Sequence, residues 1–172
     1  KRAEFEQKRA ALTADDVEGR RSLAKWCLAQ KLKQSARLCF AEIIKHACIK
    51  DASMFRELEN MSLKKYQHKK TAICQLVQRN ATIKAKVVQQ DEFEKNERRL
   101  LNFGHTLGHA LENQYELMHG QAVSIGMTYA CHISEQLCGF KQTEKVVAVL
   151  EKYNLPTYAS FNKQKVFDVL KM

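Results

Sequence analysis

Apolar residues recur every three to four positions along most of this chain, which is the period of an amphipathic helix. Proline occurs once, at Pro156, and glycine is scarce before Gly104, so the chain has few of the breaks that strands and hairpins need. The pattern therefore predicts an all-α protein. The predicted helical segments are residues 4–33, as one helix or two, and residues 38–58, 62–90, 119–138, 143–153 and 163–170, with Gly139 as a C-cap.

Histidines gather around the helix that Gly104 is expected to start. His105 and His109 are four residues apart and lie on one face of such a helix, and His119 comes from a second element. Three imidazoles from two elements, with a carboxylate, are a typical way to hold a divalent ion. Spacing alone favours His105 and His109 as the helical ligands, although an HxxxH pair can also pack or face solvent.

A second candidate feature is a pair of opposite charges inside an apolar helix. Glu42 and Lys45 are three residues apart and share a face. Such a pair is usually solvated and contributes little to stability. Here aromatic and aliphatic residues between positions 40 and 44 flank it on nearly every side, which favours a functional role.

Basic residues close to a metal ion would hold an anionic substrate rich in oxygen. Arg98 can grip a carboxylate with two parallel hydrogen bonds, whereas Lys45 and Lys84 act as point charges for hydroxyl or phosphate oxygens. The charge-dense residues 91–99 are interpreted either as a turn that faces substrate or as the solvated start of a helix.

Composition narrows the class of protein. No apolar run reaches the length of a membrane span, and residues 1–9 are too charged for a secretory signal. The six cysteines form no CxxC pair and favour reduced thiols in a cytoplasmic protein. The net charge of +10 suggests an anionic partner, but the basic residues are dispersed and lack interleaved aromatics. A phosphorylated metabolite is therefore expected rather than nucleic acid.

Four segments of the chain resemble, in order, motifs of the C-terminal half of 3-dehydroquinate synthases. They are AEIIKH at residues 41–46, KAKVVQQDE at residues 84–92, NFGHTLGHALE at residues 102–112 and HGQAVSIGM at residues 119–127. The resemblance implies a multi-helix bundle over residues 38–172 that binds metal and substrate. Residues 1–37 are then an N-terminal helical segment to which the resemblance assigns no role.

The resemblance also implies a role for each matching residue. The metal ligands are Glu42, His105 and His119, which displaces His109 from the pair that spacing alone favours. His109 and Asn102 face the substrate phosphate. The hydroxyls and the carboxylate of the substrate are held by Lys45, Lys84, Glu94 and Arg98.

The implied reaction converts 3-deoxy-D-arabino-heptulosonate 7-phosphate to 3-dehydroquinate and phosphate in the shikimate pathway. The implied cofactors are a divalent metal, zinc or cobalt, and NAD, and the implied assembly is a homodimer. Alternatives are another sugar-phosphate cyclase, such as a 2-deoxy-scyllo-inosose or valiolone-type synthase, and a degenerate relative that keeps the metal without catalysis. A basic helical domain that binds nucleic acid is a third, weaker interpretation.

Several positions depart from the family pattern. No Gly-rich turn follows a strand, so the NAD-binding α/β domain is expected to be absent from this chain. Cys39 replaces a usual Gly, Gln121 replaces a usual Glu, and Asn96–Glu97 replaces a Gly-containing turn. We therefore expect a domain that binds metal but is an incomplete catalyst by itself.

Overall fold

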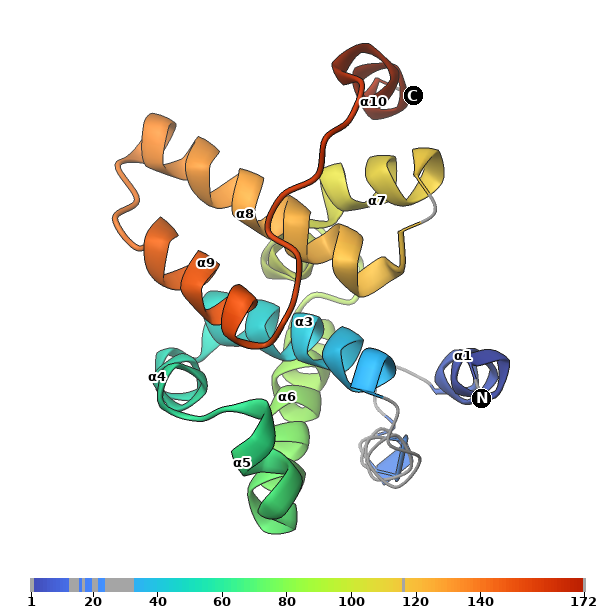
Figure 1. Cartoon of the computed structure of the whole chain (residues 1–172), viewed down its shortest axis with the longest axis vertical. Helices are drawn as coiled ribbons and strands as arrows, with labels where there is room; N and C mark the ends of the chain where they lie inside the picture. The colour runs from blue at the N-terminus through green and yellow to red at the C-terminus, as the bar shows by residue number, and fades with distance from the viewer. Residues whose placement is uncertain are drawn as a thin grey trace. The chain divides into compact units, whose positions relative to one another are not determined.

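The computed structural model describes residues 2–12, 16, 18–19, 22–23, 33–115 and 117–171. Every regular element in these residues is a helix, which confirms the all-α prediction (Figure 1). The elements are α1 (Arg2–Ala10), α3 (Lys33–Lys50), α4 (Ala52–Asn60), α5 (Leu63–His68), α6 (Lys70–Gln90), the 3₁₀ helix η1 (Glu97–Asn102), α7 (His105–Gln114), α8 (His119–Cys138), α9 (Thr143–Lys152) and α10 (Lys163–Leu170). Half of the predicted segment 4–33, including Cys27, lies outside the described residues.

The chain divides into two compact units, residues 1–101 and residues 102–172. In the first unit α3 packs against α4 and α6. Its core holds aliphatic and aromatic side chains from these helices, including Ile44, Met54, Leu58 and Leu76.

The prediction of one helix over residues 62–90 is wrong, because the segment forms two helices, and the helical pattern over residues 38–58 also belongs to two helices. Asp51 interrupts residues 38–58, because its carboxylate accepts a hydrogen bond from the Met54 amide at 2.9 Å and so caps α4. Lys69 interrupts residues 62–90 between α5 and α6 with a non-helical backbone. This break lets the buried Tyr66 of α5 donate its hydroxyl hydrogen bond to Glu57 at 2.9 Å.

The second unit is organised around a hairpin of α7 and α8, on which α9 and α10 pack (Figure 1). Its core includes Leu111 of α7, Ile125 of α8 and Val166 of α10. The Tyr115 hydroxyl, at the end of α7, accepts a hydrogen bond from the Asn162 amide at 2.7 Å just before α10. The predicted helices over residues 119–138, 143–153 and 163–170 are confirmed, and Gly139 ends α8 in the left-handed conformation (φ 67°).

Three glycines allow the backbones of α7 and α8 to approach closely. Gly104 precedes α7, as predicted, and adopts φ 77°, which a residue without a Cβ takes readily. A Cβ atom added to Gly126 would lie 1.9 Å from the Gly104 carbonyl oxygen, and one added to Gly108 would lie 3.2 Å from the Ala122 backbone. Larger residues at these positions would force the two helices apart.

Two further expectations concern the environment of the chain. Within the described ranges, no helix combines the length and the apolar content that crossing a bilayer requires. Cys74, Cys131 and Cys138 carry free thiols. Burial raises the pKa of the Cys131 thiol to about 11, so this group stays protonated and unreactive near neutral pH.

Candidate functional site

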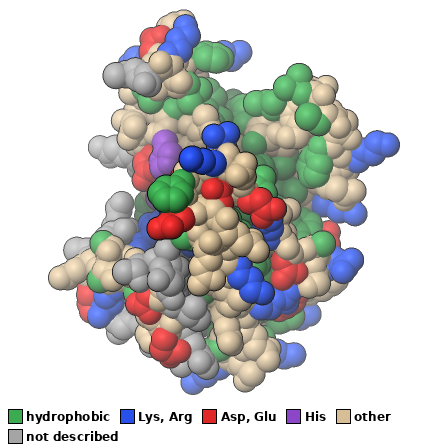
Figure 2. Space-filling model, turned by 180° about the vertical axis from the view of Figure 1, so that it is seen from behind, with side chains coloured by type: hydrophobic (Ala, Val, Ile, Leu, Met, Phe, Trp, Pro, Cys, Tyr) green, Lys and Arg blue, Asp and Glu red, His purple; other side chains and the backbone are tan. Residues whose placement is uncertain are grey.

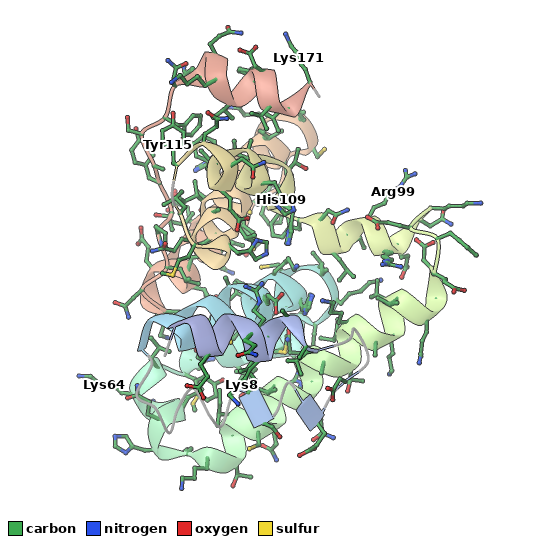
Figure 3. All side chains as sticks on the ribbon, turned by 90° about the vertical axis from the view of Figure 1, so that its right-hand side faces the viewer. Lys8, Lys64, Arg99, His109, Tyr115 and Lys171 are labelled. Atoms are coloured by element: carbon green, nitrogen blue, oxygen red, sulfur yellow. The ribbon has the colours of Figure 1, made fainter. Side chains whose placement is uncertain are left out.

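Three imidazole rings gather at the α7–α8 hairpin. His105 is the first residue of α7, His109 lies one turn further, and His119 is the first residue of α8. The His105 ring centroid lies 5.3 Å from those of His109 and of His119, and the His109 and His119 centroids are 5.7 Å apart. Figure 3 labels His109 on this hairpin, and histidine side chains (purple) reach the surface in Figure 2. The predicted convergence of imidazoles from two elements is thus present.

Hydrogen bonds constrain two of these rings. His105 Nδ1 lies 3.3 Å from the Phe103 carbonyl oxygen, and His119 Nδ1 lies 3.0 Å from Glu112 Oε2. A carbonyl or a carboxylate oxygen can only accept, so Nδ1 is the donor in both bonds. Each neutral ring then presents its Nε2 lone pair, which is the form in which imidazole binds a metal.

The donor set of this cluster fits a zinc-type cation. The ligand atoms of His109, Glu112 and His119 all lie within 4.8 Å of one another, with His105 against two of these rings. Imidazole nitrogen with carboxylate oxygen is the ligand chemistry of catalytic zinc sites. Sequence reasoning did not name Glu112 as a site residue. Its position three residues after His109, on the same face of α7, was the available signal.

In the first unit, the structure brings Glu42 and Lys84 to one pocket, with Arg9 from α1. Burial raises the pKa of Glu42, but the positive charges of Lys84, Lys45 and Arg9 outweigh it and bring the pKa to about 2. Glu42 is therefore an anion at neutral pH.

Lys45 is only 4% exposed and Glu42 is partly buried, so neither of these two charges on α3 is fully solvated. Burial lowers the pKa of Lys45 to about 8, against the opposing effect of Glu42. Nothing in the local sequence indicated that Arg9 would reach this pocket.

The predicted substrate-facing turn is organised by Asp91. Its carboxylate accepts hydrogen bonds from the backbone amides of Lys95, Asn96 and Arg98 at 2.9, 2.7 and 3.0 Å, and they lower its pKa against the effect of burial. Turns and bends span residues 92–96 and η1 follows them, so the segment contains both a turn and a helix start, and its contact with substrate stays a prediction.

Two candidate substrate residues lie on this turn. Glu94 is exposed and adopts φ 56°, so a residue with a side chain takes the left-handed conformation in a turn that lacks glycine. The Arg98 guanidinium donates to the Glu92 carbonyl at 2.6 Å and lies 3.8 Å from the Glu94 carboxylate. Asn102, the last residue of η1, is exposed.

The family described as 3-dehydroquinate synthase C-terminal matches residues 39–172. The chain belongs to this family. The resemblance found in the four motifs is therefore confirmed, and the matched range contains every candidate site residue named from the sequence.

Curated relatives agree with this assignment. The chain is 38% identical over 139 residues to a 3-dehydroquinate synthase from Thermoanaerobacter sp. (strain X514), with 77% of this chain and 39% of the relative covered. It is 42% identical over 139 residues to a 3-dehydroquinate synthase from Methylacidiphilum infernorum (isolate V4), with 77% and 37% covered. The chain thus spans less than half of the length of these relatives.

A solved structure shares the fold. It is a 2-epi-5-epi-valiolone synthase from Streptomyces hygroscopicus subsp. jinggangensis 5008 with NAD+ and Zn2+ bound. The TM-score is 0.70 at 26% sequence identity, over 81% of this chain and 41% of the other chain. The helical fold of this 3-dehydroquinate synthase C-terminal domain is thus shared with that valiolone synthase.

One departure from the family pattern has a structural account, and the position of a second is defined. Gln121 is the third residue of α8, and its side-chain oxygen accepts a hydrogen bond from the Met118 amide at 3.2 Å. An amide serves this capping role as well as the usual carboxylate would, so His119 keeps a capped helix start. Cys39 lines the same pocket as Glu42.

A buried histidine next to Glu42 predicts how the stability of the chain depends on pH. His46 is 1% exposed, and its Nδ1 lies 2.6 Å from Asn80 Oδ1. Burial and the charge of Lys45 lower its pKa from 6.5 to about 4. Between these values the unfolded chain binds more protons, so stability falls as pH falls from 6.5 to 4, by on the order of a few kcal/mol.

Urea unfolding of the wild type and of His46→Gln at pH 7.5, 5.5 and 4.5 measures this effect. As the pH falls from 6.5 to 4, the free energy of unfolding should decrease less in His46→Gln than in the wild type, because the glutamine side chain cannot titrate. An equal loss in both proteins would show that His46 is not the group responsible.

Proposed function

We propose that this chain is the metal- and substrate-binding part of a 3-dehydroquinate synthase, which converts 3-deoxy-D-arabino-heptulosonate 7-phosphate to 3-dehydroquinate and phosphate. The observation that carries the proposal is the cluster of three imidazoles at the α7–α8 hairpin of a family member. The positive charges near Glu42, from Lys84, Lys45 and Arg9, also support the proposal, because the substrate is an anion.

We propose Glu42, His105 and His119 as the metal ligands, with zinc as the metal and cobalt as a substitute. Metal ligands must be deprotonated, and the low pKa of Glu42 meets this requirement for the carboxylate. The Nδ1 contacts of His105 and His119 leave Nε2 as the nitrogen of each ring for a metal. When bound, a divalent ion polarises an alcohol or ketone oxygen and lowers the pKa of the alcohol.

The remaining candidate residues are proposed to bind and orient the substrate. Lys45 and Lys84 supply positive charge for hydroxyl and carboxylate oxygens, and Arg98 with Glu94 holds the polar groups at the turn. His109 is 59% exposed on its side chain and, with the exposed Asn102, is available to a phosphate that arrives from solvent. Their main contribution is to fix the reactants in a reactive geometry.

The NAD site is proposed to lie in an α/β domain that works together with this chain. The sequence has six glycines and no Gly-x-Gly-x-x-Gly run, so its residues do not fit a dinucleotide cradle and no step through NAD is derived from them. A homodimer in the cytoplasm is part of the same proposal.

The proposal is tested by turnover in trans. The full chain is combined with the NAD-binding domain of a curated relative, NAD, zinc and the substrate, and the release of phosphate and of 3-dehydroquinate is measured. We expect both products in equal amounts, and no product without this chain. Metal binding without any turnover would instead support a degenerate relative.

Arg98→Lys provides a graded test of the substrate assignment. Lysine keeps the charge but loses the two parallel hydrogen bonds, so we expect KM for the carboxylate-bearing substrate to rise about tenfold. An unchanged KM would contradict the role of Arg98.

The fold shared with a valiolone synthase favours a second candidate function, that of another sugar-phosphate cyclase. The two candidate functions are distinguished by testing, in the same assay, a heptulose 7-phosphate that lacks the carboxylate. Turnover of this compound, with none of the carboxylate-bearing substrate, would select the second function.

A further inference from the structure

We infer that Glu112 is the residue that positions His119 for metal binding, acting through the Nδ1 hydrogen of the ring and not as a ligand. The inference rests on the proposal that His119 is a metal ligand. Nothing in the sequence motifs assigned a role to this carboxylate.

The distance between the two side chains supports a hydrogen bond. Glu112 Oε2 lies 3.0 Å from His119 Nδ1. Two ligand atoms on one tetrahedral zinc ion, each about 2.0–2.2 Å from the metal, would be about 3.4 Å apart. The observed separation is that of a charge-assisted N–H···O bond instead.

The hydrogen bond between Glu112 and His119 joins two helices and is partly shielded from water. Glu112 lies on α7 and His119 begins α8, so the bond connects the two helices of the hairpin across their short connection. Both side chains are partly buried, with 33% and 21% of their side-chain surfaces exposed, so water competes only in part.

The chemical consequence is a fixed tautomer. With its hydrogen on Nδ1 held by a carboxylate, the His119 ring keeps its lone pair on Nε2 and cannot rotate freely. His109 Nδ1 lies 3.6 Å from the same oxygen, which is too far for a hydrogen bond. Glu112 thus selects His119 over His109.

The test measures zinc affinity and the tautomer of His119 in the full chain. Glu112→Leu removes the acceptor, whereas Glu112→Gln keeps an uncharged one. We expect zinc affinity to fall 10- to 100-fold in Glu112→Leu and less in Glu112→Gln. Nitrogen NMR of the metal-free protein should show Nδ1–H in the wild type and in Glu112→Gln, and a mixture of tautomers in Glu112→Leu.

A matched control is available on α8. His132 and Glu135 form a similar pair, with 3.7 Å between His132 Nδ1 and Glu135 Oε2, on a more exposed part of the helix. Glu135→Leu should change neither the zinc affinity nor the His119 tautomer.

Three outcomes would overturn the inference. One is wild-type zinc affinity in Glu112→Leu, and another is an unchanged His119 tautomer in that variant. The third is an absorption spectrum of the cobalt-loaded protein that changes as much in Glu112→Gln as in Glu112→Leu, because this would make Glu112 a ligand. If the wild type binds no zinc, the proposed function fails, while the tautomer still tests the role of Glu112.

Discussion

His105→Ala and His119→Ala are each expected to abolish tight zinc binding, while His109→Ala retains it. An open catalytic site uses about three protein ligands, so each of these variants loses one of the three. The loss of affinity should therefore exceed the 10- to 100-fold that follows from losing a residue outside the shell. The zinc content of the purified proteins, followed by titration of the metal-free forms, measures the difference.

His109→Ala is the decisive member of this series. The three rings lie at nearly equal distances from one another, and the ligand atoms of His109, Glu112 and His119 lie within 4.8 Å of one another. His109, Glu112 and His119 are therefore the alternative ligand set, against which the 3.0 Å contact between Glu112 and His119 argues. Loss of zinc from His109→Ala, with retention in His105→Ala, would contradict the proposed ligand set.

Gly126→Ala is expected to destabilise the chain by about 3 kcal/mol or more. The added Cβ would lie 1.9 Å from the Gly104 carbonyl oxygen, and backbone atoms cannot move aside as a flexible side chain can. The α7–α8 hairpin must then separate, which also moves His119 away from His105. Urea unfolding gives the loss of stability, and zinc titration gives the loss at the site.

Gly139→Ala is the matched control for this prediction. Gly139 ends the same helix with φ 67°, but a Cβ there meets nothing within 4 Å. The left-handed conformation alone should cost about 1–2 kcal/mol, with zinc affinity unchanged. Equal losses of stability in the two variants would show that the close approach of the helices is not what Gly126 provides.

The helical architecture could be predicted because its signals are local. The apolar pattern before Gly139 and the glycine before His105 predicted α8 and the start of α7. The breaks at Asp51 and Lys69 were missed, because the apolar pattern continues through both positions. The breaks depend on a side-chain cap and on the burial of Tyr66, and neither changes the spacing of apolar residues along the sequence.

The candidate site could be predicted only in part. Histidine spacing predicted the imidazole cluster, and the family resemblance supplied Glu42, which lies too far along the chain for spacing to indicate. The contribution of Arg9 to the Glu42 pocket and the bond of Glu112 to His119 required coordinates, since both are tertiary contacts. The left-handed backbone conformation of Glu94 could not be predicted either, because glutamate is not a residue type that favours it.

Anomalous diffraction at the zinc edge, from crystals of the full chain grown with zinc, tests the central claim most directly. The account predicts an ion about 2.0–2.2 Å from the carboxylate of Glu42 and from Nε2 of His105 and of His119. An ion bound by His109, Glu112 and His119, with Glu42 outside its coordination shell, would contradict it.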